Sequence, residues 1–315
     1  MNEQIRELPN LKVTLGSLSL KNPVIAASGT FGYGEEYAQI FPLRKLGAIV
    51  TKGLSLEPLR GNVPPRLAET AAGMLNAIGL ENVGLQVFLQ NKLPFLRKIG
   101  CPVLANIFGH TVNEFVEMGR RLADAEGISG LELNISCPNL KAGGSIFAAD
   151  PKSVYEVVHQ VRQVTSSFLM VKLSPNVADI RKIALAAEEA GADAVSLINT
   201  LIGMAIDLKT RTPILGNITG GLSGPAIKPV GLRMVWQVAQ SVRIPVVGMG
   251  GIATAEDALE YLVAGATAIQ VGTAHFADPK ASLKIIEGIQ GYLTRLRFPS
   301  LRPLIGSLRV GGNPR

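Results

Sequence analysis

The sequence predicts an α/β fold, a TIM (β/α)8 barrel with an N-terminal β-hairpin plug. The first observation is that eight short apolar runs alternate with helix-like segments along the 315 residues. The second is that most of these runs lack polar alternation, as expected for parallel strands covered on both faces. The third is that glycine-rich motifs follow the last two runs, where barrels bind phosphate. Eight strands with paired glycine motifs disfavour the competing architecture, a doubly wound sheet.

The hairpin plug is expected first, in residues 1–21. The stretch KVTLGSLSLKNP alternates between apolar and polar residues and contains a turn pair, Gly16 and Ser17. The eight expected strands follow it, in residues 22–27, 47–52, 102–107, 131–135, 169–173, 193–198, 245–249 and 268–272. Because no linker or change of composition separates these units, we expect residues 1–315 to form a single domain. Its last part, residues 295–315, is interpreted as a basic C-terminal tail.

Helices are expected between the strands. Thr111 is a good N-cap for the helix that begins VNEF, and Glu114 is expected to complete a capping box. Asp150 precedes a helix that has Pro151 in its first turn. The same logic, with glycine at several of the ends, predicts helices in VADIRKIALAAEEAGA, KPVGLRMVWQVAQS and TAEDALEYLVAGA.

The composition disfavours several classes of protein. With 47% hydrophobic and 17% charged residues the chain is globular. No apolar run reaches the roughly 20 residues that span a bilayer, so no membrane association is expected. The opening stretch MNEQIRELPN has no apolar core, which argues against a signal peptide. Two cysteines disfavour a disulfide scaffold and favour the reducing cytoplasm.

The net charge of +7 is concentrated near the C-terminus. No acidic residue follows Glu287, and the arginines of this region are Arg295, Arg297, Arg302, Arg309 and Arg315. We interpret them as a solvated tail, with a docking surface for a partner as the alternative. A nucleic-acid partner is not expected, because the sequence has no basic stripe interleaved with aromatic residues.

Glycine motifs at the ends of the last strands predict a phosphate site. The chemistry of a TIM barrel lies at the C-terminal ends of its strands, where backbone N–H groups and a helix N-terminus bind phosphate. VVGMGGI and QVGTA occupy these positions, and the helix of TAEDALEYL follows the first of them. GGLSG, residues 220–224, adds a further flexible backbone segment.

Two lysines end apolar strands, Lys52 in AIVTK and Lys172 in FLMVK. A lysine is seldom buried without a partner, and one reading is a side chain that extends from the strand end to solvent. A second reading is a Schiff-base lysine whose pKa is depressed by burial. A third is a fixed positive charge that stabilises an anionic ring or a carboxylate.

Four asparagines fall on or near the same rim: Asn76, Asn106, Asn134 and Asn199. A carboxamide carries both hydrogen-bond donors and an acceptor. Several of them together fit a flat ring whose edge alternates N–H and C=O groups, such as a pyrimidine or an isoalloxazine. Any one alone could instead serve only to form a turn.

Cys137 lies just past a strand end and before a proline, in a glycine-rich loop. Its thiol can act as a base once positive neighbours lower the pKa. Cys101, in GCPVL, is instead interpreted as a small buried hydrophobic residue. No second cysteine or histidine lies at ligand spacing from Cys137, so no metal site is expected.

Seven motifs in register resemble one family. They are NPVIAASGTFGYGEEY, TKGLSLEPLRGNVPPR, MLNAIGLENVGL, ELNISCPN, VKLSPN, GGLSGPAIKP and VVGMGGI. Together they resemble the dihydroorotate dehydrogenases, most closely the catalytic subunit of the NAD-linked class 1B, over roughly residues 22–290. Two segments depart from the family pattern, GNITGGLSG and NLKAGGSIFAAD, and both concern loops.

The resemblance implies an FMN-dependent barrel that oxidises (S)-dihydroorotate to orotate in pyrimidine biosynthesis. Cys137 would remove the C5 proton while hydride leaves C6 for flavin N5. By similarity, the substrate would be held by Lys52, Asn76, Ala77, Ile78, Gly79, Leu80, Asn134, Asn199 and Thr200. FMN would be held by Ser28, Lys52, Gly53, Asn106, Asn134, Lys172, Ile198, Gly224, Gly250, Gly251, Gly272 and Thr273.

The electron acceptor remains the open point of this resemblance. The chain has no dinucleotide-binding glycine fingerprint, and two cysteines cannot hold an iron–sulfur cluster. If NAD is the acceptor, the resemblance implies a partner electron-transfer subunit with FAD and an iron–sulfur cluster, in a heterotetramer built on a homodimer. The alternatives are direct reduction of fumarate without a partner, or a non-redox, phosphate-binding barrel lyase that uses Lys172 or Lys52.

Overall fold

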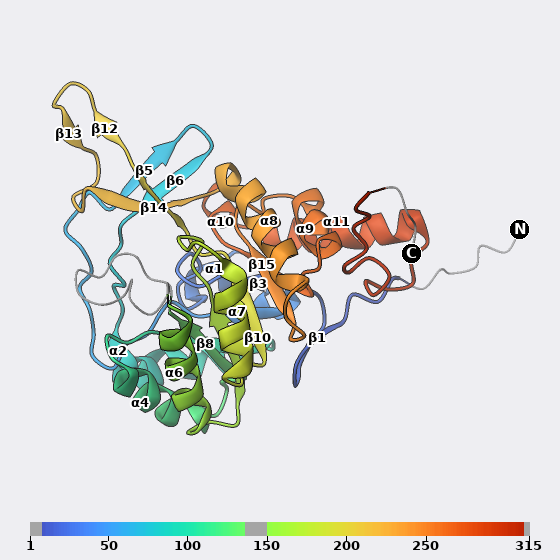
Figure 1. Ribbon diagram of the computed structural model, residues 1–315, viewed down its shortest axis with the longest axis horizontal. Helices are drawn as coiled ribbons and strands as arrows, with labels where there is room; N and C mark the ends of the chain where they lie inside the picture. Colours follow the sequence, from blue (N-terminus) through green and yellow to red (C-terminus); the bar gives the residue numbers. More distant parts are fainter. Residues whose placement is uncertain (1–7, 136–149, 312–315) are drawn as a thin grey trace, which may run out of the picture.

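Eight parallel strands close into a barrel at the centre of the molecule (Figure 1). The computed structural model describes residues 8–135 and 150–311. The barrel strands are β3 (Val24–Ala26), β4 (Ala48–Val50), β7 (Val103–Ile107), β8 (Gly130–Asn134), β9 (Phe168–Lys172), β10 (Ala194–Leu197), β15 (Val246–Met249) and β16 (Ala268–Val271). All eight predicted strands are confirmed, with ends that differ from the prediction by at most two residues.

The strands follow one another around the barrel in chain order, and β16 pairs with β3 to close it. Nearly every residue of these strands is buried, which explains why the sequence shows apolar runs and not alternation. The register fixes the upper rim: Asn134 of β8 lies opposite Lys172 of β9. Polar residues at the C-terminal strand ends are thereby brought to one mouth.

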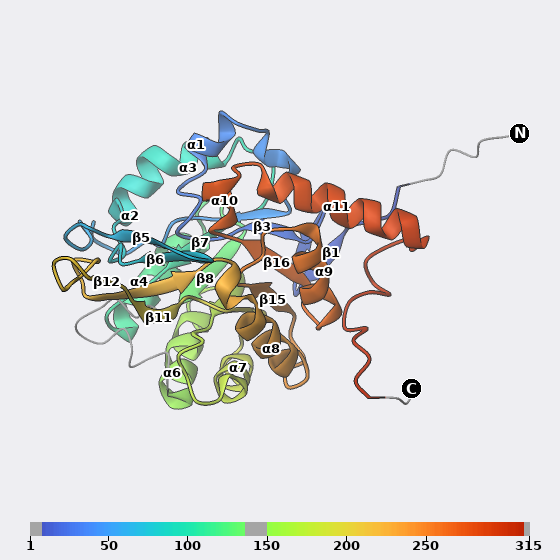
Figure 2. The ribbon, with the colours of Figure 1, turned by 90° about the horizontal axis from the view of Figure 1, so that it is seen from above.

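Helices surround the barrel and pack against their neighbours in chain order (Figure 2). The longer ones are α4 (Val112–Ala123), α6 (Pro151–Arg162), α7 (Ile180–Glu189), α8 (Lys228–Ala239), α9 (Ala255–Val263) and α11 (Ala281–Leu296). The helix predicted after Asp150 is α6, with Pro151 in its first turn, and the Asp150 side chain caps it by accepting from the N–H groups of Lys152 and Ser153. The capping box of α4 is wrong in one half: Thr111 accepts from Glu114 N, but the Glu114 carboxylate accepts from His110 N.

Short helical segments fill the remaining connections. They are α1 (Glu35–Ala38), η1 (Leu43–Lys45), α2 (Gly84–Val87), η2 (Phe88–Lys92), α3 (Leu93–Leu96), η3 (Pro225–Ile227) and α10 (Ala274–Ala277). In the part of the chain that the structure describes, no helix is both long and apolar enough to cross a membrane.

The predicted hairpin is present near the N-terminus, formed by β1 (Val13–Leu15) and β2 (Leu18–Leu20). The turn of the hairpin lies next to the N-terminal ends of the barrel strands. A Cβ on Gly16 would come within 3.2 Å of Asp193, the residue that directly precedes β10. The hairpin therefore closes the end of the barrel opposite the polar rim.

A small antiparallel sheet stands over the polar rim, and the sequence analysis missed it. Its strands are β11 (Leu201–Met204), β14 (Thr219–Ser223), β6 (Gly73–Asn76) and β5 (Leu67–Thr70), in that order. A two-stranded hairpin, β12 (Ile206–Asp207) with β13 (Thr212–Pro213), extends beyond it (Figure 1). The loops after barrel strands β4 and β10 supply these strands, so two connections distant in sequence meet above the barrel mouth.

The C-terminal segment differs from the expected solvated tail. Helix α11 runs to Leu296 and so includes the first residues of the predicted tail. After it, Leu301 and Leu304 are buried in the main core, and the N–H of Gly306 donates to the carbonyl of Leu262 in α9. The described arginines of this segment are exposed, as predicted, but the backbone that carries them is anchored on the barrel.

Candidate active site

A cavity of about 790 Å³ opens at the C-terminal ends of the barrel strands, below the small sheet. Most of the predicted site residues line it: Ser28, Lys52, Gly53, Asn76, Ile78, Gly79, Leu80, Asn106, Asn134, Lys172, Ile198, Asn199, Thr200, Gly224, Gly250, Gly251, Gly272 and Thr273. Ala77 does not line it, because its side chain is buried between Leu75 and Leu215. Cys137 lies outside the described residues.

Lys172 forms part of the cavity floor. It ends β9, is 7% exposed, and its Nζ donates to Ser28 Oγ at 3.0 Å. This contact joins the C-terminal end of β9 to the loop after β3, two segments that are far apart in the sequence. A buried ammonium in this place supplies fixed positive charge to a ligand that develops negative charge.

Lys52 supplies a second cation at the side of the cavity. Burial lowers the pKa of its ammonium, and the nearby charges of Glu81 and Arg66 act in opposite directions on it. Lys52 also borders a second cavity of about 500 Å³, together with Tyr33 of the loop after β3 and with Arg60 and other residues of the loop after β4. The lowered pKa is compatible both with a fixed charge and with an amine that loses its proton more readily than usual.

Polar side chains from the small sheet form the cover of the cavity. Asn76 Nδ2 donates to the carbonyl of Gly221 at 3.2 Å, which links β6 to β14. A Cβ on Gly221 would lie 2.0 Å from Thr200 Oγ1, so this position requires glycine. Asn199 Oδ1 accepts from the Thr200 backbone N–H at 2.8 Å. These contacts hold three predicted substrate residues at one end of the cavity.

The glycine turn after β15 is a candidate phosphate site. Gly250, Gly251 and Ile252 line the cavity, and their backbone N–H groups have no acceptor within residues 8–135 and 150–311. A Cβ on Gly251 would lie 2.8 Å from Lys228 N, so the turn packs directly against the start of α8. Successive N–H groups in such a turn form a concave anion site.

The N-terminus of α9 offers fewer free N–H groups to this phosphate site than the sequence predicts. Asp257 Oδ2 accepts from the N–H groups of Ala253 and Thr254, and Thr254 Oγ1 accepts from Asp257 N. This complete capping box satisfies donors that a phosphate would otherwise use. The glycine turn is therefore the main source of free N–H groups.

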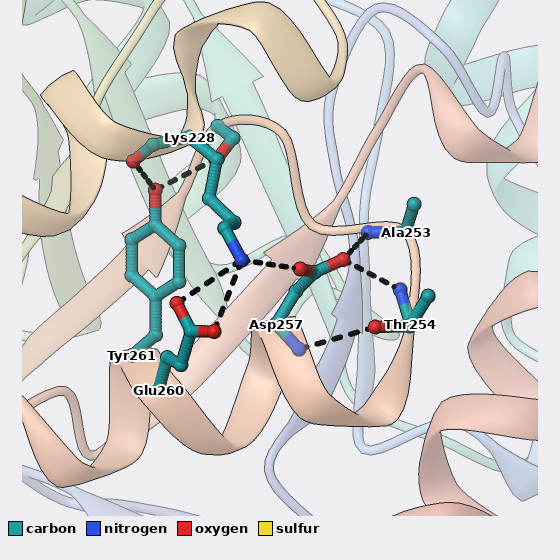
Figure 3. A network of polar contacts seen from close by, with 7 residues as sticks. Lys228, Ala253, Thr254, Asp257, Glu260 and Tyr261 are labelled. Atoms are coloured by element: carbon teal, nitrogen blue, oxygen red, sulfur yellow. Dashed lines mark hydrogen bonds and ion pairs between the residues drawn. The ribbon is translucent and has the colours of Figure 1, made fainter.

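A lysine behind the turn compensates the charge of the cap, as Figure 3 shows. Lys228 Nζ lies 2.7 Å from Asp257 and 3.0 Å from Glu260. Burial raises the pKa of Asp257, but the bonds from Lys228 and the backbone outweigh it and leave the pKa below its usual range. Tyr261 Oη donates to the carbonyl of Gly250 at 2.7 Å. This network ties α8, α9 and the glycine turn together.

His275 lies behind the glycine and threonine that follow β16. It is 1% exposed, its Nδ1 lies 3.1 Å from the Gly272 carbonyl, and its Nε2 lies 2.9 Å from Ser282 Oγ. Burial lowers the pKa of the imidazole to about 4, against smaller opposite effects of Gly272 and Asp278. The neutral ring donates from Nδ1 to Gly272 and accepts the Ser282 hydroxyl, so it supports the cavity wall without carrying charge.

Two polar residues of the barrel interior were missed by the sequence analysis, Glu132 and Gln270. Glu132 lies two residues before Asn134 on β8, and Gln270 lies two residues before Gly272 on β16. Because strand side chains alternate between faces, each shares the inward face with a predicted site residue. This alternation was the available signal. Among the described residues, no group of acidic, histidine and cysteine side chains could hold a metal ion.

The fold and the cavity define a class of protein: a (β/α)8 barrel whose mouth offers an anion site, two cations and several carboxamides. Comparison with known proteins identifies the family within that class. The family model described as dihydroorotate dehydrogenase matches residues 10–293. The chain belongs to the dihydroorotate dehydrogenase family, which confirms the resemblance found in the motifs.

Several similar proteins carry the name dihydroorotate dehydrogenase B (NAD(+)), catalytic subunit. The one from Geotalea uraniireducens is 57% identical over 300 residues, 95% of this chain and 98% of that protein. The one from Geobacter metallireducens is 56% identical over 302 residues, 96% of this chain and 99% of that protein. Membership of this family implies a flavin-dependent enzyme, and the names imply that those relatives work with a second subunit.

Proposed function

We propose that this chain is the catalytic subunit of an NAD-linked enzyme that oxidises (S)-dihydroorotate to orotate in pyrimidine biosynthesis. The observation that carries the proposal is the convergence of two lysines, four asparagines and an anion-binding turn on one cavity at the barrel mouth. The relatives' names support both the reaction and the NAD-linked class.

FMN is the proposed cofactor, and the residues present fit it. The Gly250–Gly251 turn offers N–H groups for its phosphate, with Gly224, Gly272 and Thr273 around it. The buried oxygens Asn106 Oδ1 and Gln270 Oε1 have no partner among the described residues and would accept from a ring N–H. When bound, FMN supplies the hydride acceptor that side chains lack.

The remaining chemistry is assigned to side chains of this chain. Lys172 and Lys52 supply positive charge at the cavity floor and side, where it would stabilise negative charge on a bound ring and on the substrate carboxylate. Asn76, Asn199 and Thr200 are proposed to orient the pyrimidine edges through their amide and hydroxyl groups. Ala77 is proposed to act through its backbone alone, because its side chain faces away from the cavity.

Cys137 is the proposed general base. It follows β8 by three residues and is proposed to take the proton from C5 while hydride leaves C6, so that a double bond forms between these carbons. Asn134, at the end of the same strand, lines the cavity and supports the placement of this base at its rim.

The partner subunit is proposed to carry FAD and an iron–sulfur cluster and to pass electrons to NAD, in a heterotetramer built on a homodimer. The relatives' description as catalytic subunits of NAD(+)-dependent enzymes supports this route over direct fumarate reduction. The cytoplasm is the proposed location, and the free thiol of Cys101 supports it.

The proposal is tested by a visible spectrum of the purified chain, titrated with FMN and then with dihydroorotate under anaerobic conditions. Stoichiometric flavin binding and bleaching by dihydroorotate are expected. Flavin that stays oxidised would contradict the substrate assignment. Borohydride trapping of a substrate adduct at Lys52 or Lys172 would instead favour the Schiff-base lyase.

A further inference from the structure

A buried carboxylate lies inside the barrel beneath the proposed flavin site. Glu132 is fully buried and accepts three hydrogen bonds from neutral donors. Asn106 Nδ2 donates to its Oε2 at 2.6 Å, and Gln270 Nε2 donates to its Oε1 at 2.8 Å. Ser196 Oγ also donates to Oε1, at 2.9 Å. Four strands, β7, β8, β10 and β16, thus meet at one acidic side chain.

The carboxylate fixes the orientation of both carboxamides. An ionised carboxyl group has acceptors only, so the NH2 group of each amide must face Glu132 and its oxygen must face away. The structure has this arrangement, and Asn106 Oδ1 and Gln270 Oε1 are both buried without a partner among the described residues. Both residues line the cavity, whereas Glu132 and Ser196 do not.

One of these oxygens, Asn106 Oδ1, lies next to a residue that lines the cavity. Asn106 Oδ1 lies 2.9 Å from the point where a Cβ on Gly53 would stand, and Gly53 is itself a cavity-lining residue. The glycine therefore leaves room for the oxygen on the cavity side. A buried acceptor without a donor costs roughly 1–3 kcal/mol, which a bound ligand with an N–H or O–H group recovers.

We propose that Glu132 is a positioning residue that makes this part of the cavity floor accept hydrogen bonds and not donate them. Through Asn106 and Gln270 it selects a ligand edge that presents an N–H. The oxidised isoalloxazine ring has a single N–H, at N3, and the inference therefore rests on the proposed flavin site. Gln270 becomes a cofactor-contacting residue in addition to those the sequence indicated.

Packing alone does not account for the arrangement. Burying a carboxylate is costly unless hydrogen bonds compensate for the lost water, and an apolar side chain of similar size would fill the space without that cost. A neutral amide in place of the carboxylate could either donate to or accept from each neighbouring amide and so would leave their orientations unspecified. Only an obligate acceptor between them fixes both oxygens toward the cavity.

The test compares the native chain with Glu132→Gln, both loaded with FMN. The new amide brings a donor as well as an acceptor, so one neighbouring amide must turn its NH2 group to the cavity. FMN affinity is expected to fall about tenfold or more. The pH at which the bound flavin loses its N3 proton, followed by its absorbance, is expected to shift downward, which a packing defect would not cause.

Ser196→Ala is the matched control. It removes a third hydrogen bond to Glu132 but leaves both amides bonded to the carboxylate. Its FMN affinity and N3 ionisation are expected to stay close to the native values. Unchanged N3 ionisation and affinity in Glu132→Gln would overturn the inference while leaving the flavin assignment intact.

A measurement on the native chain decides the matter if Glu132→Gln fails to fold. FMN methylated at N3 lacks the donor that the floor requires, and its affinity is expected to be at least about tenfold below that of FMN. Equal affinity for the two flavins would overturn the inference. A native chain that binds no FMN at all would instead refute the proposed function, together with everything that rests on it.

Discussion

Acidification is expected to destabilise the protein through one histidine next to the proposed flavin site. His275 is buried and neutral between the Gly272 carbonyl and the Ser282 hydroxyl, with a pKa of about 4. In the unfolded chain the same imidazole regains its ordinary pKa of about 6.5. Between these two values the unfolded state binds more protons than the folded state, so stability decreases as the pH falls.

The size of this effect follows from the two pKa values. The stabilisation is complete above the unfolded pKa and is lost as the pH falls through the window from about 6.5 to about 4. A difference of this size corresponds to about 3 kcal/mol in the free energy of unfolding. By pH 5 about 2 kcal/mol of it is gone.

The assay is urea unfolding at pH 7.5 and pH 5.0, for the native chain and for His275→Asn. The variant loses some stability at both pH values, but its free energy of unfolding should change less between them, by about 2 kcal/mol. Carboxylates that do not interact with His275 contribute equally to both proteins, and the interaction between Asp278 and the imidazole is a smaller effect than burial, so the comparison isolates mainly the imidazole. Parallel pH dependence of the two proteins would refute the reasoning. NMR of labelled histidine gives the pKa directly, since the chain has only three histidines.

Three further predictions concern the cavity. Lys228→Met leaves the negative charge of the Asp257 carboxylate uncompensated behind the glycine turn. FMN affinity should therefore fall about tenfold, while riboflavin, which lacks the phosphate, binds as before. An equal loss of affinity for both ligands would contradict the phosphate assignment. Gly251→Ala places a Cβ 2.8 Å from Lys228 N at a position with a φ of +72°. Isothermal titration should show that FMN affinity falls about tenfold or more. An affinity equal to that of the native chain would disprove the close packing. Cys137→Ala should bind FMN normally but reduce it about a hundredfold more slowly in stopped-flow absorbance; near-native reduction would reveal another base.

The barrel could be predicted because each of its strands is buried on both faces, which leaves an uninterrupted apolar run in the sequence. The small sheet above it has no such signal. GGLSG, residues 220–224, predicts a flexible segment because it is rich in glycine, yet Thr219–Ser223 forms strand β14. Glycine is needed there because Thr200 approaches the strand too closely for a side chain at Gly221. Steric demands between distant segments are not visible in a local pattern.

The candidate site could be predicted where its residues end the strands, as for Lys172, Asn134 and Gly272. Residues whose environment depends on the whole barrel carry no such local signal. Glu132 and Gln270 lie within apolar runs, and only the closed barrel brings their side chains together. Ala77 is assigned to the substrate site together with its neighbours, because the whole motif of residues 76–80 resembles the family. Its side chain turns away from the cavity.

The account is tested most directly by a single anaerobic turnover of the FMN-loaded chain with excess dihydroorotate and no acceptor. It predicts that one orotate is formed per bound flavin, with bleaching of the flavin at the same rate. Bleaching without orotate, or orotate formed without reduction of the flavin, would contradict it.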